Sequence, residues 1–232
     1  MDKRAAMRLW AENIRAIGVE ATMLERPKAA FIAALKGKKA VGRGAAGRET
    51  VLKEDAEVVA KCRKCLLGGL RAHSVYGDGN VMAEIVFVGE APGAEEDRQG
   101  LPFVGRAGVL LNKLLEQVGL MRSEVYICNV IKCRPPENRD PLPEEISACK
   151  PYLDKQLSVI KPRVICCLGL HAAQTILNKK DAMTRLRSAS HVLSDGTTVV
   201  PTYHTAAALR FPAYKQQIYD DLIRARDIAY GL

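Results

Sequence analysis

The 232-residue sequence lacks any run of about 20 apolar residues, which is the length that a helix needs to cross a bilayer. Its first residues, MDKRAAMRLWAENIRAIG, also lack the continuous apolar core and the small-residue cleavage site of a secretory signal. We therefore expect a cytoplasmic protein that does not associate with membranes. The seven cysteines are an odd number in a chain without an export signal, which favours reduced thiols or metal ligation over a disulfide framework.

The sequence also lacks an uninterrupted block of lysines of the kind found in nucleic-acid-binding tails. Its net charge is nevertheless +9, and clustered lysines and arginines bind polyanions because they release counterions from phosphates. A polyanionic partner is consistent with this composition, but many soluble proteins are basic and charge alone does not identify a partner.

The length suits one well-buried domain with an extension. Residues 2 to 17 have the apolar spacing of an amphipathic helix, and residues 37 to 49 are rich in glycine, alanine and positive charge, which indicates a flexible linker. We therefore divide the chain into a basic helical extension, residues 1–49, and a domain, residues 50–232. The extension is either a specific docking module or a loosely ordered basic arm.

Four apolar runs follow, each succeeded by a helical pattern, which predicts an α/β fold with three α/β/α layers and a four-stranded parallel sheet. The runs are EIVFVG (84 to 89), VYICNVI (125 to 131), RVICCLG (163 to 169) and TTVVPTY (197 to 203). The expected helices lie near residues 107 to 118, 143 to 159, 170 to 178 and 213 to 229. Ligands of such sheets bind outside the carboxyl ends of the strands.

Polar residues stand at three of these strand ends. Glu90 follows the first run, Asn129 lies near the end of the second, and His204 follows the fourth. Taken singly, Asn129 is compatible with a structural hydrogen bond and His204 with a structural role, since buried polar groups must be paired. Their joint position on one rim favours a functional site.

The longest loop lies beside that rim and reads GEAPGAEEDRQGLPFVGRAG, residues 89 to 108. Loops of this length in compact domains are usually functional or disordered. Its glycines permit turns that other residues resist, and its acidic side chains supply carboxylates. The alternative is a solvated acidic loop with one apolar anchor at Pro102, Phe103 and Val104.

Four cysteines form a second group, with Cys62 and Cys65 as a CxxC pair and Cys133 and Cys149 at the two ends of a proline-rich loop. Four thiolates suit either a tetrahedral metal ion or a four-iron cluster, and sequence physics alone does not separate zinc from iron and sulfur. The other three cysteines lie in predicted strands, where cysteine behaves as a small buried hydrophobe: Cys128, Cys166 and Cys167.

The order of these motifs resembles the iron-sulfur-cluster uracil-DNA glycosylases, family four of their superfamily. The resemblance rests on the upstream CxxC, GEAPGAEEDRQGLPFVGRAG, CNVIKCRPPENRDPLPEEISAC, and VPTYH with an arginine six residues later. It covers Cys62 to about Leu222 and excludes the first 50 residues. It implies a protein that flips uracil out of DNA and cuts the bond between uracil and deoxyribose.

The resemblance also implies roles for residues around the base. Asn129 would bind the uracil edge and Phe103 would stack on the flipped ring, while Glu90 and Ala91 would arrange backbone groups and the reactive water. His204 would donate a hydrogen bond to uracil O2 as negative charge builds on the leaving base.

Further residues follow from the same resemblance. Glu96 would lie near the C5 side of the base and exclude thymine, with Gly93 and Asp97 as additional substrate-binding residues. Cys62, Cys65, Cys133 and Cys149 would hold a [4Fe-4S] cluster. Because Ala91 stands where other branches place an aspartate that activates water, we expect modest activity.

One segment departs from the family pattern, since Thr205 follows His204 where proline is usual. The loss of proline frees the backbone, so either the loop retains its shape by packing or the chain is a weakened or respecialised member of the family. Leu209 is the candidate intercalating side chain and Arg210 the candidate phosphate contact. A covalent crosslink to DNA through histidine is not expected, because the extra basic loop of that branch is absent.

We expect a monomer that acts on uracil in single-stranded or double-stranded DNA. Two other functions remain open at this stage. One is a cluster-bearing DNA-binding or damage-sensing protein with weak or altered glycosylase activity, and the other is a zinc-stabilised nucleotide-binding protein.

Overall fold

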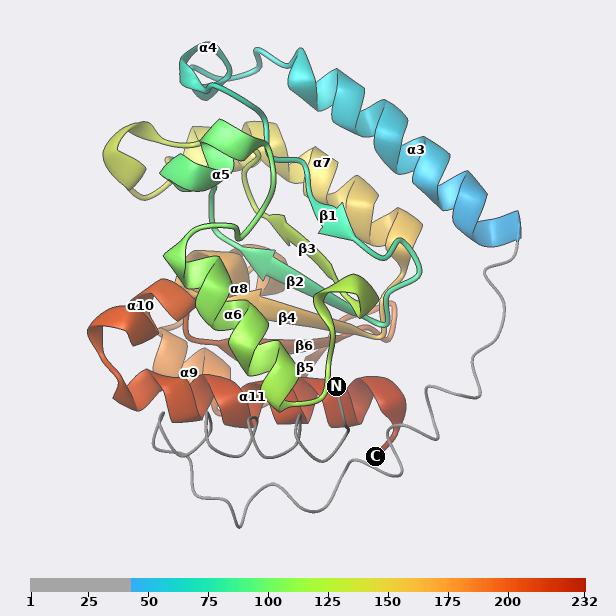
Figure 1. Ribbon diagram of the computed structural model, residues 1–232, viewed down its shortest axis with the longest axis vertical. Coiled ribbons are helices and arrows are strands. Elements are labelled where there is room, and N and C mark those ends of the chain that lie inside the picture. Colours follow the sequence, from blue (N-terminus) through green and yellow to red (C-terminus); the bar gives the residue numbers. More distant parts are fainter. Residues whose placement is uncertain (1–42) are drawn as a thin grey trace, which may run out of the picture. The chain divides into compact units, whose positions relative to one another are not determined.

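The first helix of the computed structural model, which describes residues 43–232, is α3 (Arg43–Ala60) (Figure 1). The predicted amphipathic helix of residues 2 to 17 lies outside the described residues. The predicted linker is wrong for residues 43 to 49, which form the first turns of α3. The reason is a buried stripe at seven-residue spacing, Ala45, Leu52 and Val59, which gives this segment a face to pack.

The central sheet has six strands in the order β1-β3-β2-β4-β6-β5 (Figure 1). Its four inner strands are parallel and coincide with the four predicted runs, whereas the two edge strands run antiparallel to their neighbours. The strands are β1 (Asp78–Gly79), β2 (Ile85–Gly89), β3 (Tyr126–Asn129), β4 (Val164–Leu168), β5 (His191–Val192) and β6 (Thr198–Thr202). The α/β class is confirmed, and the predicted strand count misses the edges because each edge strand has only two residues.

Every residue of β2, β3 and β4 is buried, as expected for parallel strands covered on both faces. One core joins alternate strand residues to α3 and α7 and includes Leu52, Val86, Cys128, Leu153 and Ile165. The opposite set of strand residues faces the layer that contains α11, which contacts β2, β4 and β6. The three cysteines predicted to lie in the core are fully buried, so this prediction is confirmed.

The four predicted helices are present as α6 (Arg106–Gln117), α7 (Pro143–Ile160), α8 (Leu170–Leu177) and α11 (Ala213–Tyr230). The short helices were not predicted, because each has too few residues for a periodic pattern. They are α4 (Leu67–Leu70), α5 (Ala94–Gln99), α9 (Met183–Arg187), α10 (Thr205–Arg210) and the single 3-10 turns η2 (Arg122–Glu124) and η3 (Pro136–Asn138).

Two short helices lie at the rim of the sheet. The long loop predicted for residues 89 to 108 contains α5, and the segment after His204, for which the sequence left two alternatives open, forms the helix α10. Among residues 43–232, no helix is long and apolar enough to cross a membrane.

Candidate active site

A cleft of about 550 Å³ lies at the carboxyl ends of the parallel strands. Its walls come from the end of β2, the end of β3, the proline-rich loop before α7, and α10. The lining residues are Glu90, Ala91, Pro92, Gly93, Glu96, Phe103, Ala107, Asn129, Pro135, Asn138, Arg139, Asp140, His204, Ala206, Ala207 and Arg210. We call this cleft the rim pocket, and it brings together most of the residues that the sequence singles out.

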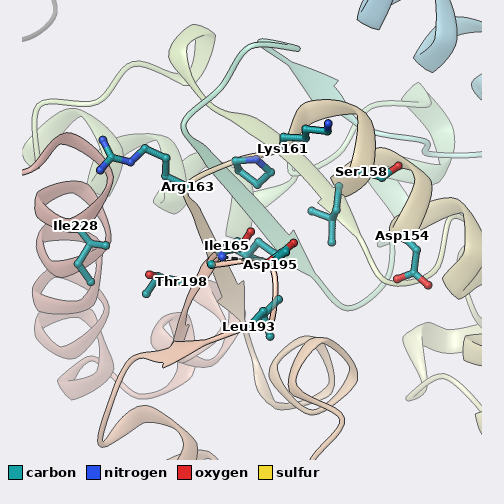
Figure 2. A pocket seen from close by; sticks show the side chains of 13 residues that line it. Asp154, Ser158, Lys161, Arg163, Ile165, Leu193, Asp195, Thr198 and Ile228 are labelled. Atoms are coloured by element: carbon teal, nitrogen blue, oxygen red, sulfur yellow. Dashed lines mark hydrogen bonds between the residues drawn. The ribbon is translucent and has the colours of Figure 1, made fainter.

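A larger hollow of about 810 Å³ lies at the opposite end of the sheet, where β4 and β6 begin (Figure 2). Its walls mix two acidic residues, Asp154 and Asp195, with Lys161 and Arg163. It contains none of the predicted site residues and lies away from the strand ends at which parallel sheets bind ligands. The rim pocket is therefore the better candidate despite its smaller size.

Asn129 ends β3 and is buried, with 1% of its surface exposed. Its backbone carbonyl accepts a hydrogen bond of 2.7 Å from the buried ammonium of Lys132, but its side-chain Oδ1 has no hydrogen-bond partner. A buried acceptor without a donor is costly, typically about 1–3 kcal/mol. The alternative of a structural hydrogen bond through Oδ1 is therefore not supported, and the arrangement is that of an amide prepared for a ligand.

Phe103 is held beside Asn129 in a left-handed conformation with φ of 52°, which is uncommon for a bulky residue. Arg122 fixes this turn, since its guanidinium donates to the carbonyl of Phe103 at 3.2 Å and to that of Pro102. Gly108 permits it, because a Cβ atom there would overlap the Phe103 carbonyl group. Since the backbone is fixed from two sides, the Phe103 ring has a defined place in the rim pocket.

The Glu96 carboxylate binds the next part of the same turn. Its Oε1 accepts hydrogen bonds from the backbone N–H groups of Val104, at 2.9 Å, and Gly105, at 2.8 Å. Gly105 is the N-cap of α6, where unpaired N–H groups favour a carboxylate. Glu96 therefore lines the rim pocket and orders the loop that carries Phe103.

His204 lies across the rim pocket, with its ring centroid 5.6 Å from that of Phe103. It is the N-cap of α10, and its Nδ1 accepts a hydrogen bond of 3.1 Å from the backbone N–H of Ala206. Burial lowers the pKa of His204 from 6.5 to about 4, and the negative charge of Glu96 opposes this shift only in part. At neutral pH the ring is uncharged, and because Nδ1 is an acceptor, the single proton is on Nε2.

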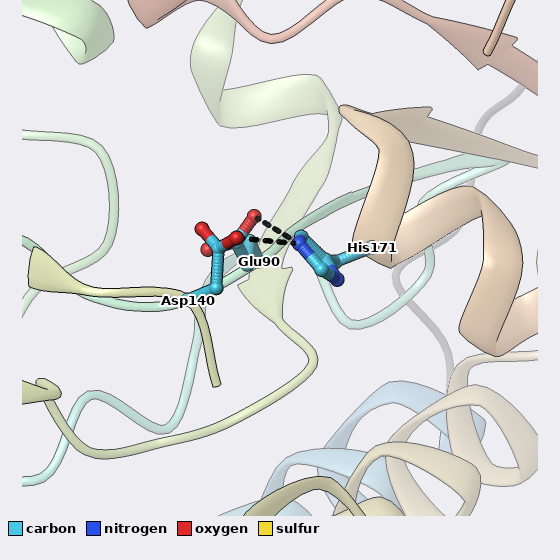
Figure 3. A group of neighbouring side chains, drawn as sticks. All are labelled: Glu90, Asp140 and His171. Atoms are coloured by element: carbon cyan, nitrogen blue, oxygen red, sulfur yellow. Dashed lines mark ion pairs between the residues drawn. The ribbon is translucent and has the colours of Figure 1, made fainter. Parts of the chain in front are cut away.

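Glu90 belongs to a group of three ionisable side chains at the edge of the rim pocket (Figure 3). His171 Nε2 lies 3.4 Å from Asp140 Oδ2 and 4.0 Å from Glu90 Oε2. Burial is the main factor that raises the pKa of Glu90; Asp140 adds to the rise and His171 counteracts it. Glu90 thus holds its proton more tightly than an exposed glutamate does.

The other predicted site residues separate into two groups. Ala91, Gly93 and Arg210 line the rim pocket, and the neighbouring Leu209 is 40% exposed at the end of α10. Asp97 lies outside the pocket lining, and its carboxylate accepts hydrogen bonds from the backbone N–H groups of Ala72 and His73. Asp97 therefore fixes α5 to the segment after α4 and is not brought to the pocket.

The four predicted ligand cysteines line one small enclosure between α3, α4 and α7. Three of the sulfurs accept hydrogen bonds: Cys133 from the Arg71 guanidinium at 2.7 Å, Cys149 from the Lys132 backbone N–H at 3.2 Å, and Cys62 from the Tyr152 hydroxyl at 3.5 Å. Donors around sulfur are typical of metal-bound thiolates. The donor set therefore fits a metal centre.

The four sulfurs surround one enclosure without meeting at a single point. A zinc ion with bonds of about 2.3 Å would hold tetrahedral sulfurs about 3.8 Å apart. Among the described residues, no three of these cysteine sulfurs lie within 4.8 Å of one another.

Sequence reasoning missed several residues that shape the site. Arg122 and His171 carry no motif signal, because each acts through a partner that is distant in sequence. Lys132 stands inside the recognised CNVIKC motif and is fully buried, with its Nζ also bonded to Gln156. The sequence signal for Lys132 was its position between Asn129 and Cys133, which both have predicted roles.

Comparison with known proteins identifies similar chains. The family described as the uracil DNA glycosylase superfamily matches residues 76–223. A type-4 uracil-DNA glycosylase of Sulfurisphaera tokodaii is 44% identical over 186 residues, which are 77% of this chain and 84% of that protein. Type-4 uracil-DNA glycosylases of Archaeoglobus fulgidus and Thermotoga maritima are 46% and 47% identical, each across 70% of this chain and 85% of the relative.

Proposed function

Because the chain belongs to the type-4 uracil-DNA glycosylases of the uracil DNA glycosylase superfamily, we propose that its rim pocket binds uracil flipped out of DNA and hydrolyses the N-glycosidic bond. The reaction leaves an abasic site in the strand and begins base excision repair. The observation that carries the assignment to this pocket is the buried, unpartnered Oδ1 of Asn129, with the uncharged His204 also in the pocket lining.

Asn129 supplies the recognition of uracil. Its Oδ1 would accept the N3–H of uracil, and its side-chain N–H would donate to O4. Cytosine presents the opposite pattern at these two positions, with an acceptor at N3 and an amino group at C4. The amide in this orientation therefore pairs with uracil and leaves cytosine with two mismatched contacts.

His204 supplies stabilisation of the leaving group. As the glycosidic bond breaks, the sugar becomes oxocarbenium-like and the base departs as an anion with charge on O2. The Nε2–H of the uncharged imidazole would donate to O2 and strengthen its bond as that charge grows. A histidine with a pKa of about 4 keeps this donor in a single protonation state at neutral pH.

Glu90 and Ala91 would hold the reactive water on the sugar side of the base. Ala91 offers no carboxylate for this task, and the adjacent Glu90 does. Once deprotonated, Glu90 would accept a proton from the water that attacks the sugar carbon. Its raised pKa makes it a better acceptor than an exposed glutamate.

Phe103 would stack on the flipped base, and Glu96 and Gly93 would close the C5 side against thymine. The two hydrogen bonds from Val104 and Gly105 keep the Glu96 carboxylate from moving aside for a methyl group. Asp97 would act on substrate only indirectly, by holding α5 in place.

Cys62, Cys65, Cys133 and Cys149 would hold a [4Fe-4S] cluster. In a cluster each thiolate binds its own iron, which suits sulfurs that surround a common space without meeting. The cluster would connect α3 and α4 to the proline-rich loop and α7, and so would support the wall of the rim pocket. We further propose that the protein acts as a cytoplasmic monomer on single-stranded or double-stranded DNA, with Leu209 as the wedge and Arg210 on a phosphate.

The direct test is uracil excision from an oligonucleotide, followed by alkaline cleavage at abasic sites. We expect scission of an oligonucleotide with one uracil and none of a matched strand with thymine. Asn129→Ala should reduce excision by about two orders of magnitude, because a ligand contact and the fit of the base are both lost. Absence of scission by the wild-type protein at stoichiometric amounts would refute the proposal.

The competing hypothesis of a damage sensor without efficient hydrolysis rested on the missing proline after His204. The ordered start of α10 removes that motive, because Thr205 occupies the first position of a helix that His204 caps. The type-4 glycosylase relatives likewise do not favour it.

A further inference from the structure

Phe211 is an exposed aromatic side chain with no assigned role. Its exposed fraction is 59%, and of the phenylalanine and tyrosine side chains between residues 44 and 232 it is the only exposed one. It directly follows α10, whose residues Ala206, Ala207 and Arg210 line the rim pocket. Single exposed apolar side chains are common on protein surfaces, so the neighbours of Phe211 decide whether it belongs to a binding surface.

The ring is held in place and does not stand alone. The backbone N–H of Phe211 donates to the Ala207 carbonyl at 2.8 Å, and its carbonyl accepts from Tyr214 at 3.0 Å. The Phe211 ring meets the Tyr214 ring edge to face, with centroids 5.8 Å apart, and Tyr214 stacks on Tyr203 at 4.1 Å. We call these three residues, Tyr203, Tyr214 and Phe211, the aromatic step.

Basic residues lie near the aromatic step. Arg187, which is ion-paired with Asp221, lies over the Tyr203 ring with its Cζ 5.7 Å from the centroid, while Arg210 directly precedes Phe211 in sequence and Lys215 follows four positions later. Surfaces that bind single strands combine aromatic rings, on which bases stack, with basic groups that follow the phosphates. The position of this pairing directly after α10, which lines the rim pocket, favours DNA as the partner.

The length of α10 sets which base is in reach. Six residues span about 9 Å of helix, which is between two and three times the rise of about 3.4 Å per nucleotide in a duplex strand. Since α10 leads from His204 to Phe211, a base within three nucleotides of the flipped uracil meets the aromatic step.

We propose that Phe211 is a stacking site for an unpaired DNA base located one to three nucleotides from the uracil on the same strand. The proposal rests on the proposed function, because it places the strand relative to a uracil in the rim pocket. It deepens that function by giving the enzyme a second base contact, one that single-stranded DNA offers without any cost of unpairing.

The test combines a protein change with a matched change in the DNA. Single-stranded oligonucleotides with one uracil are prepared with a base-free propanediol spacer at each of the six neighbouring positions, three on either side. For the wild-type protein, the spacer at one position should lower kcat/KM about tenfold, the order expected for one base stacked on an aromatic ring. Phe211→Ala should have the same reduced kcat/KM for the oligonucleotide with that base and for the one with the spacer. Phe211→Trp should again have a higher kcat/KM when the base is present.

Controls separate stacking from folding and from chemistry. Val192→Ala removes another exposed apolar side chain, on β5, and should leave kcat/KM unchanged on every oligonucleotide. The single-turnover rate at saturating Phe211→Ala should equal that of the wild type, because the contact acts on binding. Thermal unfolding of each variant verifies that the fold is retained.

Two outcomes would overturn the proposal: an equal effect of Phe211→Ala with and without every neighbouring base, or no effect on any substrate. If the wild-type protein excised no uracil, the proposed function would fail separately from the stacking proposal. The affinities for the same oligonucleotides would then be measured by fluorescence anisotropy. A dependence of affinity on the neighbouring base that is lost in Phe211→Ala would support stacking, and its absence in the wild type would refute it.

Discussion

Gly89 and Asn129 are register partners at the carboxyl ends of β2 and β3, and a Cβ atom on Gly89 would collide with Asn129 Oδ1 and with the Phe103 ring. The residue that would recognise the base and the residue that would stack on it therefore share a space that only glycine leaves open.

The first prediction follows from that space. Gly89→Ala should displace both Asn129 and Phe103 and lower kcat/KM for uracil excision by about a hundredfold, since a shift of about 1 Å in a reacting geometry is sufficient for such a loss. Gly47→Ala in α3, where a Cβ atom meets nothing within 4 Å, is the matched control and should retain full activity. Equal activity of the two variants would show that the Gly89 contact is relieved elsewhere.

The second prediction separates the two functions of His204. His204→Ala removes the cap of α10 and the proposed O2 donor, whereas His204→Asn restores a good N-cap residue. Both variants should lose about two to three orders of magnitude in single-turnover excision, the scale of a lost anion-stabilising donor, but only His204→Ala should also lose thermal stability. Recovery of excision in His204→Asn would contradict the donor role.

The low pKa of His204 has a consequence for stability, which is the third prediction. Between pH 6.5 and about 4 the unfolded histidine binds a proton that the folded one does not. The free energy of unfolding should therefore fall as the pH drops through this window. Urea unfolding of the wild type and of His204→Asn at pH 7.0 and 5.0 measures the difference, and the variant should lose less stability over this interval.

The fourth prediction concerns the pKa of Glu90, which substitutions of its two neighbours should shift in opposite directions. Excision should decline as the pH falls through the pKa of Glu90, at a pH above the ordinary glutamate value of 4.5. His171→Gln removes a group that lowers this pKa, so the acid limb of kcat/KM should move to higher pH. Asp140→Asn removes a group that raises it, so the limb should move to lower pH. Shifts in the same direction would exclude Glu90 as the titrating group.

The fifth prediction concerns the cysteines. Cys149→Ser should abolish the brown colour and broad violet absorbance of an iron-sulfur cluster and lower the melting temperature, because a cluster ligand and the link between α7 and the rim loop are lost. Cys166→Ala changes a cysteine buried in β4 and should retain the colour. A colourless wild-type protein that contains zinc would overturn the cluster assignment.

The sheet and its main helices were predictable because each has a strong period of its own. The runs around Val86, Ile127, Ile165 and Val199 are continuously apolar, and parallel strands buried on both faces have that signature. Asn129 and His204 were predicted to lie together because strand ends in parallel sheets share one rim, and both line the rim pocket.

The rest of the site depends on contacts that the sequence does not record. Arg122 reaches the Phe103 turn from 19 positions away, and His171 meets Glu90 from the start of α8. Asp97 stands one residue from Glu96 but points to a different segment, so a motif that includes both gave them the same role. Helical geometry, in which neighbours face different directions, separates them.

The two edge strands of the sheet have a consequence for how the protein behaves at high concentration. β1 and β5 are each two residues long and run antiparallel to their neighbours. At each edge the sheet therefore ends in a very short strand, which does not present a long row of free N–H and C=O groups. Long bare edges pair with one another between molecules and lead to aggregates. The short edge strands therefore limit pairing between the sheets of neighbouring molecules.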